Sequence, residues 1–279
     1  MAFPTITVIT VVYNRVNTIE QTISSVVNQT YPYLEYIVID GGSTDGTVDI
    51  IKKYEKQIAY WVSEKDAGIY DAMNKGVRVA TGDYIEFLNS DDCFCSYNII
   101  SQVVKEIDED TDILSCWIYV VDEKSKREWV VTNSHAVNKR QYNGGMIPHP
   151  GMFTKKRLLE KYPFDVRLKI ASDYKFFLTC YYDDTIRFKY INFPVVYFSN
   201  AGISSNENFE AKEIERELGK NFGGNSAKTR LIAILRSVFG NFIYTTSRAF
   251  FWIPIRDRFR ILHRCNNKIC RWCGRDNNL

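Results

Sequence analysis

The sequence has no long apolar run. Its 279 residues contain no uninterrupted stretch of about 18 apolar residues, the length that a transmembrane helix needs. The nearest candidate, residues 231–255, is broken by Arg236, Asn241 and Arg248. The N-terminus, MAFPTITVITVVYNR, also lacks the basic region and the small-residue cleavage site of a secretory signal. The sequence therefore predicts a cytoplasmic protein without a transmembrane helix.

Cysteine is sparse and has no paired pattern. The seven cysteines are an odd number at irregular spacings, which argues against a disulfide framework and favours a reducing compartment. One group, His263, Cys265, Cys270 and Cys273, holds four possible zinc ligands. The spacing of these four residues is not one that standard zinc sites use. We therefore favour metal-free thiols over a zinc site.

Two common phosphate-binding loops are absent as well. There is no G-K-[ST] of a P-loop and no G-x-G-x-x-G of a dinucleotide-binding turn. A basic, glycine-rich N-terminal loop of the kind found in sugar-nucleotide pyrophosphorylases is also missing, because VVYNRVNT contains no glycine. A nucleotide-binding function, if present, must use another type of loop.

Acidic residues are scarce in the C-terminal segment. Residues 222–279 contain eleven Lys/Arg and two acids, whereas the rest of the chain has 25 Lys/Arg against 31 acids. A basic, aromatic segment on an acidic body suggests contact with a polyanion or with an anionic membrane face. Membrane contact is slightly favoured, because an amphipathic helix can lie among the headgroups. The alternatives are a helix that packs on the body with a solvated basic face, or an oligomer contact. No nucleic-acid-binding motif accompanies the charge, so nucleic acid is not an expected partner.

The first half of the chain alternates strands with helices. Runs rich in β-branched and aromatic residues predict strands, and apolar residues at helical spacing predict helices between them. The predicted strands are 5–13, 35–40, 58–64 and 83–88, and the predicted helices begin at Asn17, at Thr44 or Asp45, and at Gly68. This rhythm predicts a parallel sheet, whose ligands bind beyond the carboxyl ends of the strands.

The second half is less regular. Residues 112–121 and 127–131 predict a hairpin, 155–162 and 172–182 predict helices, and 186–198 predict a strand pair or one bent strand. Helices are predicted to dominate after residue 206.

Polar residues follow the predicted strands of the first half. Asp91 and Asp92 could bind a hard cation such as Mg²⁺ or Mn²⁺ or could form a polar turn, and these residues alone favour neither. Asp40, before two glycines, could accept hydrogen bonds from a base or ribose, although a tight turn is the better reading of that motif alone. Lys75 could meet a phosphate or could pair with Asp71 one helical turn away.

Four motifs occur together and in order: VITVVYNR, IDGGSTDGT, DAGIYDAMNKG and GDYIEFLNSDD. Together they resemble the family 2 glycosyltransferases, which are nucleotide-sugar enzymes. The resemblance is dense over residues 5–95 and resumes at 149–178, a segment similar to the acceptor half of bacterial polysaccharide-biosynthesis members. It implies an α/β fold of the GT-A type, with a mostly parallel central sheet flanked by helices. The implied domains are a catalytic domain of 1–205, split into a nucleotide-sugar half (1–95) and an acceptor half (96–205), and a helical basic extension (206–279).

The resemblance also implies roles for individual residues. Asp91 would bind the divalent ion, Mn²⁺ or Mg²⁺, that sits on the donor diphosphate. Asp173 matches the catalytic base of the family. Without the resemblance, its position indicates only an acidic residue in the first turn of a helix. His149 is a candidate contact to the acceptor or the diphosphate. With Lys75 added from its own pattern, the expected donor-binding residues are Thr10, Tyr13, Asp40, Asp66, Lys75, Asn89 and Asp92.

The sequence departs from the family pattern at two positions. Asn89 stands where the first acid of the D-x-D motif is usual, and Gly41 stands where a second acid often follows Asp40. The Q-x-x-R-W motif and the transmembrane helices of processive members are also absent.

The sequence therefore predicts an inverting, non-processive, metal-dependent glycosyltransferase. It would move a sugar from a nucleoside-diphosphate sugar, most simply a UDP-sugar, to a hydroxyl of a glycan or lipid-linked acceptor in polysaccharide biosynthesis. The expected location is the cytoplasm, with peripheral attachment to the inner face of the plasma membrane. The alternatives are a non-catalytic nucleotide-sugar-binding homologue, which Asn89 motivates, and a sugar-nucleotide pyrophosphorylase.

Overall fold

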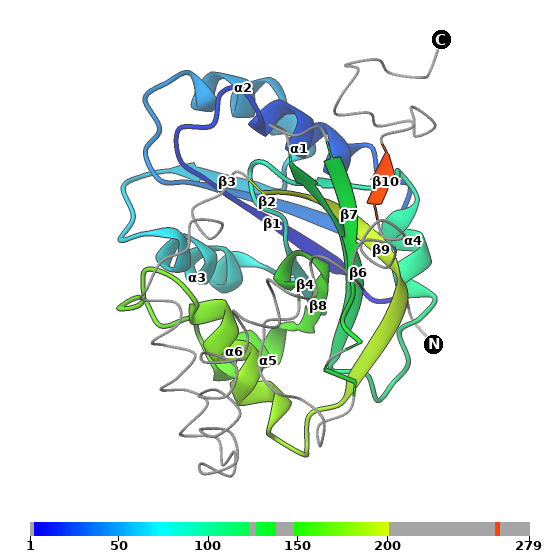
Figure 1. The fold of residues 1–279 in the computed structure, drawn as a ribbon. Helices are drawn as coiled ribbons and strands as arrows, with labels where there is room; N and C mark the ends of the chain where they lie inside the picture. The colour runs from blue at the N-terminus through cyan, green and yellow to red at the C-terminus, as the bar shows by residue number, and fades with distance from the viewer. Residues whose placement is uncertain (1–2, 123–126, 135, 138–147, 201–259, 263–279) are drawn as a thin grey trace, which may run out of the picture.

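One continuous mixed sheet organises the protein. The computed structural model describes residues 3–122, 127–134, 136–137, 148–200 and 260–262. Eight of the ten strands follow the order β10-β7-β6-β8-β4-β1-β2-β3, and β9 pairs with β6 and with β5 (Figure 1). The strands are β1 (Ile6–Val12), β2 (Leu34–Asp40), β3 (Tyr60–Ser63), β4 (Tyr84–Phe87), β5 (Cys93–Phe94), β6 (Ile113–Asp122), β7 (Arg127–Val131), β8 (Met152–Lys155), β9 (Phe188–Ser199) and β10 (Arg260–Leu262).

The four strands of the first half run parallel, as the sequence predicts. β1 pairs with β2 over seven consecutive residues and with β4 on its other side, and β3 extends the sheet beyond β2. Every residue of β1 is buried, which fits a run of Ile, Val and Thr covered on both faces. The connecting helices are α1 (Ile19–Val27), α2 (Thr47–Lys53) and α3 (Ile69–Val79).

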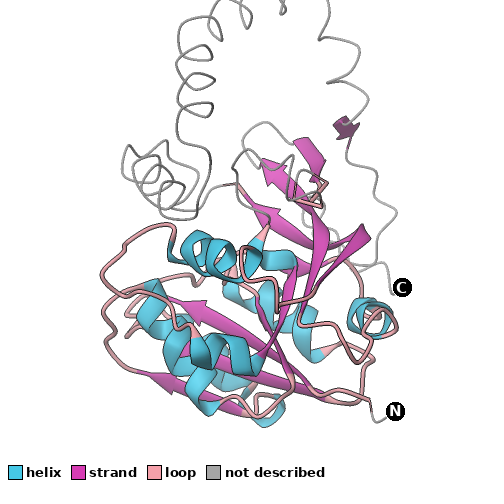
Figure 2. Ribbon diagram, turned by 90° about the horizontal axis from the view of Figure 1, so that it is seen from below, coloured by secondary structure: helices cyan, strands magenta, loops and turns pink. Residues whose placement is uncertain are grey.

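Helices cover both faces of this parallel part. Alternate residues of β1 point to opposite sides, so Val8 belongs to a core with α1 and α2, and Ile9 belongs to a core with α3. We call these the α1-side core and the α3-side core. The helices α5 (Lys156–Lys161) and α6 (Ser172–Tyr181) complete the α3-side core, while α4 (Ile99–Val104) joins the α1-side core. Figure 2, which views the molecule from below, shows the same helices packed along the strands.

The second half extends the same sheet. β8 runs antiparallel between β4 and β6, and β6 forms the predicted hairpin with β7. β9 is one long strand parallel to β6, with register shifts near Trp117, so the bent-strand alternative is the correct one. The sequence did not predict β8, α4 or β5, which have four, six and two residues.

Two helices begin later than predicted. α1 begins at Ile19 rather than at Asn17, and the hydroxyl of the preceding Thr18 donates to Ser90 O (2.8 Å) instead of capping the helix. α2 begins at Thr47, where Asp45 accepts hydrogen bonds from the Thr47 backbone and hydroxyl. In both cases the polar residue predicted to start the helix belongs to the loop before it.

Most of the C-terminal extension lies outside the described residues, as do the predicted amphipathic helix residues around Leu231 and the four candidate zinc ligands. The exception is Arg260–Leu262, which pairs antiparallel with β7 as β10. The predicted predominance of helices after residue 206 therefore does not extend to these three residues, which pair with the open edge of the β6–β7 hairpin. In the part of the chain that the structure describes, no helix has the length and apolar character to cross a membrane.

Candidate active site

The loops after β1, β2, β3 and β4 meet at one edge of the sheet, as predicted from the parallel order. We call this edge the rim. The loop after β1 is tied to the loop after β2, because Asn14 N donates to Ser43 Oγ (2.7 Å) and Thr44 N donates to Asn14 Oδ1 (2.9 Å). The loop after β3 joins them through Glu64 N, which donates to Asp40 O (3.0 Å).

Asp40 sits beneath the rim. Its side chain is fully buried (0% exposed) and accepts four hydrogen bonds from the protein itself. The donors are the backbone N–H groups of Gly42 and Ser43 and the hydroxyls of Ser43 (2.5 Å) and Ser63 (2.6 Å). The sequence predicts that Asp40 contacts the nucleoside directly. In the structure its carboxylate holds the loop at Gly42 and Ser43 and the end of β3 at Ser63.

Thr10 and Tyr13 lie at different depths. Thr10 is fully buried within β1, and its hydroxyl accepts a hydrogen bond from Tyr36 (3.1 Å), so it too supports the rim from beneath. Tyr13, directly after β1, is 60% exposed. Of these two predicted donor-binding residues, Tyr13 is therefore the one that is exposed.

Asp66 lies against Gly41. A Cβ built on Gly41 would come within 2.6 Å of Asp66 Oδ2, so no side chain fits there without displacing the carboxylate. Asp66 Oδ1 accepts a hydrogen bond from Gly68 N (2.9 Å). In this structure the absence of a side chain at Gly41 leaves room for the Asp66 carboxylate at the rim.

Lys75 fastens the loop that carries Asp66. Its Nζ lies 2.8 Å from Glu64 Oε1 and 3.7 Å from Asp71 Oδ2, and it donates to Lys65 O (3.3 Å). These contacts, chiefly the hydrogen bond and charge of Glu64, raise the pKa of Lys75 above its usual value. The predicted pairing with Asp71 is present, with Glu64 as the closer partner.

The segment after β4 forms a turn, the alternative that the sequence left open. Asp92 N donates to Asn89 O (3.0 Å), and Thr22 of α1 donates to Asp92 O (2.7 Å). Asp92 is 1% exposed, and its Oδ1 accepts a hydrogen bond from Ser199 N at the end of β9 (2.8 Å). The structure therefore places Asp92 as a support that ties this turn to β9.

The same turn also has the chemistry of a cation site. Asp91 is half-buried, and Asn89 Oδ1 is buried with no hydrogen-bond partner among the described residues. The described part of the chain has no group of three His, Cys, Asp or Glu residues that would hold an ion alone. Mg²⁺-type ions commonly use one or two protein oxygens and take the rest from substrate phosphates and water. A carboxylate and an unused amide oxygen in one turn fit such an ion.

Asp173 lies in the first turn of α6, as predicted, and contacts two side chains distant in sequence. Tyr70 of α3 donates a hydrogen bond to Asp173 Oδ1 (2.9 Å), and His149 Nδ1 lies 3.4 Å from Asp173 Oδ2. Burial lowers the pKa of His149, against the opposing charge of Asp173, so the imidazole is neutral near pH 7. Burial, followed by the charge of Asp173, raises the pKa of Tyr70, which keeps the phenol protonated.

Residues outside the predicted site hold Asp173 in place. Asn74 of α3 bonds both backbone groups of Phe164, and Ala171 directly before α6 adopts a left-handed conformation (φ 67°). The sequence analysis assigns no role to Tyr70 or Asn74. The available signal was their position, four residues apart on the helix face that also carries buried Met73 and Val77.

Comparisons with known sequences follow the same outline. The family model described as glycosyl transferase family 2 matches residues 7–206. An uncharacterized glycosyltransferase of Mycobacterium tuberculosis is 34% identical over 179 residues, which make up 63% of this chain and 68% of that protein.

Solved structures share the fold. S. aureus TarS (1–349) in complex with UDP-GlcNAc has a TM-score of 0.62 at 22% identity, over 78% of this chain and 65% of that chain. The mannosyltransferase PcManGT from Pyrobaculum calidifontis, in complex with GDP-Man and Mn²⁺, has a TM-score of 0.54 at 22% identity, over 77% and 61%. The chain thus spans less than two thirds of either protein, and at these identities the likeness concerns the fold alone.

Proposed function

The chain belongs to glycosyl transferase family 2 and has the GT-A fold, and from this premise we propose that it is an inverting, non-processive transferase. It would move one sugar per encounter from a nucleoside-diphosphate sugar to a hydroxyl of a glycan or lipid-linked acceptor in polysaccharide biosynthesis. The observation that carries the proposal is the rim, where four parallel strands bring Tyr13, Asp66 and Asp91 to one edge of the sheet.

The donor would bind along the rim. Tyr13 would stack on the base, and Asp66 would accept hydrogen bonds from the nucleotide or the sugar. Thr10, Asp40 and Asp92 would act from beneath, since the side chain of each already makes at least one hydrogen bond inside the protein. Lys75 would keep the Asp66 loop in place. A UDP-sugar is favoured by the UDP-GlcNAc complex of TarS, and the GDP-Man complex of PcManGT makes a GDP-sugar the runner-up.

Asp91 would hold a divalent ion, Mn²⁺ or Mg²⁺, with the amide oxygen of Asn89 as a weaker second ligand. When bound, the ion would stabilise the negative charge that develops on the nucleoside diphosphate as it leaves. Asn89 supplies no charge of its own, so the protein contributes fewer negative charges to this site than a D-x-D pair would. The donor diphosphate would then supply much of the binding energy for the ion.

Asp173 would act as the general base. A sugar hydroxyl is a poor nucleophile until a base removes its proton, and a carboxylate at hydrogen-bond distance does this. One base and a direct displacement give inversion at the anomeric carbon. His149, next to Asp173, stands on the acceptor side in this arrangement.

The proposed location is cytoplasmic, at the inner face of the plasma membrane, with residues 1–205 as the catalytic domain and the basic segment 206–279 as the contact to the membrane. A non-catalytic donor-binding homologue is the second candidate, because Asn89 replaces an acid. Donor binding without transfer and without donor hydrolysis would favour it. A pyrophosphorylase is disfavoured by the missing glycine-rich loop.

A thermal-shift panel of UDP-, GDP- and dTDP-sugars, each with and without Mn²⁺, tests the proposal. Specific binding raises the melting temperature by mass action, and ligand at about 100 times its Kd adds about 2.7 kcal/mol of stability. We expect a Mn²⁺-dependent rise with one nucleotide class, and we expect Asp91→Ala to abolish the Mn²⁺-dependent part.

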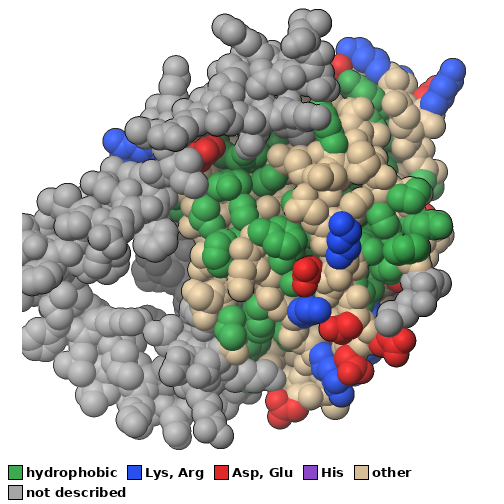
Figure 3. Space-filling view, turned by 90° about the vertical axis from the view of Figure 1, so that its right-hand side faces the viewer, with side chains coloured by type: hydrophobic (Ala, Val, Ile, Leu, Met, Phe, Trp, Pro, Cys, Tyr) green, Lys and Arg blue, Asp and Glu red, His purple; other side chains and the backbone are tan. Residues whose placement is uncertain are grey.

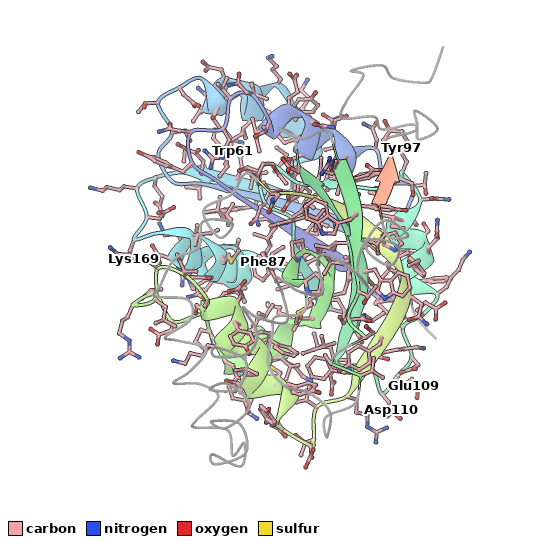
Figure 4. All side chains as sticks on the ribbon, in the orientation of Figure 1. Trp61, Phe87, Tyr97, Glu109, Asp110 and Lys169 are labelled. Atoms are coloured by element: carbon pink, nitrogen blue, oxygen red, sulfur yellow. The ribbon has the colours of Figure 1, made fainter. Side chains whose placement is uncertain are left out.

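Asp110→Ala is the matched control, since it removes the same charge far from the rim. Asp110 is exposed at the opposite side of the molecule from Trp61 of β3 (Figure 4). A folded wild-type protein that responds to none of the donors would contradict the proposal, and so would equal responses in the two variants.

A further inference from the structure

Three polar side chains from three elements meet at the N-terminus of α6. They are Tyr70 from the first turn of α3, His149 from the short 3₁₀ helix His149–Gly151, and Asp173 from α6. Tyr70 and Asp173 are 103 residues apart in the sequence. A contact of this kind, between a buried phenol and a carboxylate on different elements, constrains the carboxylate more than a local turn would.

Tyr70 is fixed in one orientation. Its side chain is 7% exposed, and its ring packs against Phe164 with centroids 5.7 Å apart. The hydroxyl of this held ring donates its proton to Asp173 Oδ1, at 2.9 Å. Tyr70 occupies one oxygen of Asp173 and leaves Oδ2 for other partners.

His149 faces that second oxygen. Its Nδ1 lies 3.4 Å from Asp173 Oδ2, its side chain is 21% exposed, and its Nε2 is buried without a hydrogen-bond partner among the described residues. A buried N–H without a partner is rarer than a buried acceptor without one. The proton of the neutral imidazole therefore belongs on Nδ1, facing the carboxylate, and Nε2 is left as an acceptor.

A second acid near this end of α6 is already paired. Asp165 lies 2.8 Å from both Arg167 Nη2 and Lys175 Nζ, and these contacts hold the pKa of Asp165 far below its usual value. In the part of the chain that the structure describes, Tyr70 and His149 are the side chains set directly against the Asp173 carboxylate.

We propose that Tyr70 and His149 are positioning residues that clamp the Asp173 carboxylate, so that Oδ2 receives the proton of the acceptor hydroxyl. This rests on the proposed function, in which Asp173 is the base. In that step the acceptor oxygen forms a bond to the anomeric carbon and its proton moves to Oδ2. The bond from that carbon to the diphosphate oxygen breaks, and its electron pair leaves with the nucleoside diphosphate. Tyr70 and His149 exchange no proton and only hold the Asp173 carboxylate in position.

The first test observes the clamp without any turnover. The chain has only three histidines, His135, His149 and His263, so long-range ¹H–¹⁵N spectra of the histidine-labelled full-length protein resolve each imidazole. The signal lost in His149→Asn identifies His149. We expect a neutral Nδ1–H tautomer near pH 7, and a pKa that falls by roughly half a unit or more in Asp173→Asn, because an opposite charge is removed. A His149 with its proton on Nε2, or with a titration unchanged in Asp173→Asn, would overturn the proposal.

The second test uses UDP release from UDP-GlcNAc and Mn²⁺, with water as the acceptor. In Tyr70→Phe the carboxylate loses the donor that fixes Oδ1, so Oδ2 is aimed at the acceptor for a smaller fraction of the time. We expect kcat to fall about tenfold while the KM for the donor is unchanged. His149→Asn keeps an N–H near the position of Nδ1 and should stay within about threefold of wild type, whereas His149→Leu should lose about tenfold.

An unchanged kcat in Tyr70→Phe, a fall in kcat matched by a change in the donor KM, or equal rates in the Asn and Leu variants would mean that these residues are structural only. If the wild type releases no UDP, the imidazole titration alone decides the matter. Donor-induced thermal shifts of the same variants separate the two proposals. Loss of donor binding in wild type contradicts the proposed function, whereas normal donor binding with an uncoupled His149 contradicts only the clamp.

Discussion

Glu86 is a buried acid with no visible partner. It lies in the middle of β4 at 0% exposure, and neither carboxylate oxygen makes a hydrogen bond within the described residues. Its neighbours on the same face of β4, Tyr84 and Leu88, belong to the α1-side core. An ionised carboxylate without partners is very costly in such a core, so the group stays protonated instead. Burial, followed by the charge of Asp92, raises the pKa of Glu86 well above its usual value.

This acid should make the protein less stable as pH rises. Because the pKa of Glu86 is higher in the folded chain than in the unfolded chain, the folded chain binds the extra proton between the two values. The stabilisation is complete below the unfolded pKa of about 4.3 and falls by about 1.36 kcal/mol per pH unit until the folded pKa is reached. Glu86→Gln cannot ionise, so we expect its stability relative to wild type to increase from pH 5 to pH 8 in urea unfolding.

Glu109→Gln is the control, because Glu109 is exposed at the edge of the molecule (Figure 4). Its pH profile should run parallel to that of the wild type. If the Glu86→Gln profile also runs parallel to wild type, Glu86 is either ionised in the folded protein or hydrogen-bonded to a group outside the described residues.

At the residue scale the sequence predicted where site residues stand, but not what their polar atoms do. Asp40 was expected at the carboxyl end of a strand, and it is there. Its four oxygen contacts come from a loop and from the neighbouring strand, so they depend on how Ser43 and Ser63 fold around it. The sequence shows a carboxylate at the end of a strand, but not whether the protein or a ligand satisfies it.

At the element scale, α3 links the rim, the proposed donor site, to Asp173, the proposed base. It packs closely on β1, because a Cβ on Gly76 would come within 2.6 Å of Ile9 Cγ2. Its Asn74 side chain donates to Phe164 O (2.8 Å) and accepts from Phe164 N (3.0 Å). The same helix begins just after the Asp66 loop and presents Tyr70 to Asp173. The position of α3 therefore affects both the donor rim and the base.

Asn74→Ala should loosen the segment before α6. It removes two hydrogen bonds, each worth about 0.5–1.5 kcal/mol, so the free energy of unfolding should fall by about 1–3 kcal/mol. Urea unfolding measures this, with Arg78→Ala on the exposed side of the same helix as the control. A loss in Asn74→Ala no larger than in Arg78→Ala would mean that the two contacts to Phe164 add nothing to stability.

The elements that the sequence predicted are those with a strong local pattern. β1 and β2 are runs of β-branched residues buried on both faces, and α3 has apolar residues at regular helical spacing. β8 has four residues and β5 has two, which is too short for any periodicity to stand out. These short strands form because they pair with open edges of β4 and β9. Those edges are brought to them only by the tertiary fold.

At the scale of the whole molecule, the predicted donor and acceptor halves share one sheet. β8 of the second half pairs directly with β4 of the first, and β6 continues from β8. The two halves are therefore parts of a single sheet and not two separate sheets. On the described part of the face in Figure 3, acidic and basic side chains are interspersed. The pairs Asp108–Lys189 and Asp110–Arg187 illustrate this mixing.

The basic segment contrasts with this balanced surface. Residues 222–279 carry eleven Lys/Arg against two acids, while the remainder of the chain is acidic. A lipid-linked acceptor would be reached most easily by an enzyme held at the membrane. We expect the full-length protein to bind vesicles that contain anionic lipid, and to bind neutral vesicles much more weakly. The attraction should weaken with salt, because exposed charges are screened within about 10 Å at 0.1 M ionic strength.

Replacing Arg256, Arg258 and Arg264 with Gln should reduce vesicle binding. Each basic residue near an anionic surface contributes about 1 kcal/mol, so three give about 3 kcal/mol, a loss on the order of a hundredfold in affinity. Arg260 is left unchanged because it belongs to β10.

Replacing Lys52, Lys53 and Lys56 with Gln removes the same charge from exposed positions on the acidic body, and this triple variant should bind nearly as well as wild type. Equal losses in the two variants in co-sedimentation would show that net charge alone drives binding, and unchanged binding in both would remove the basic segment from any membrane contact.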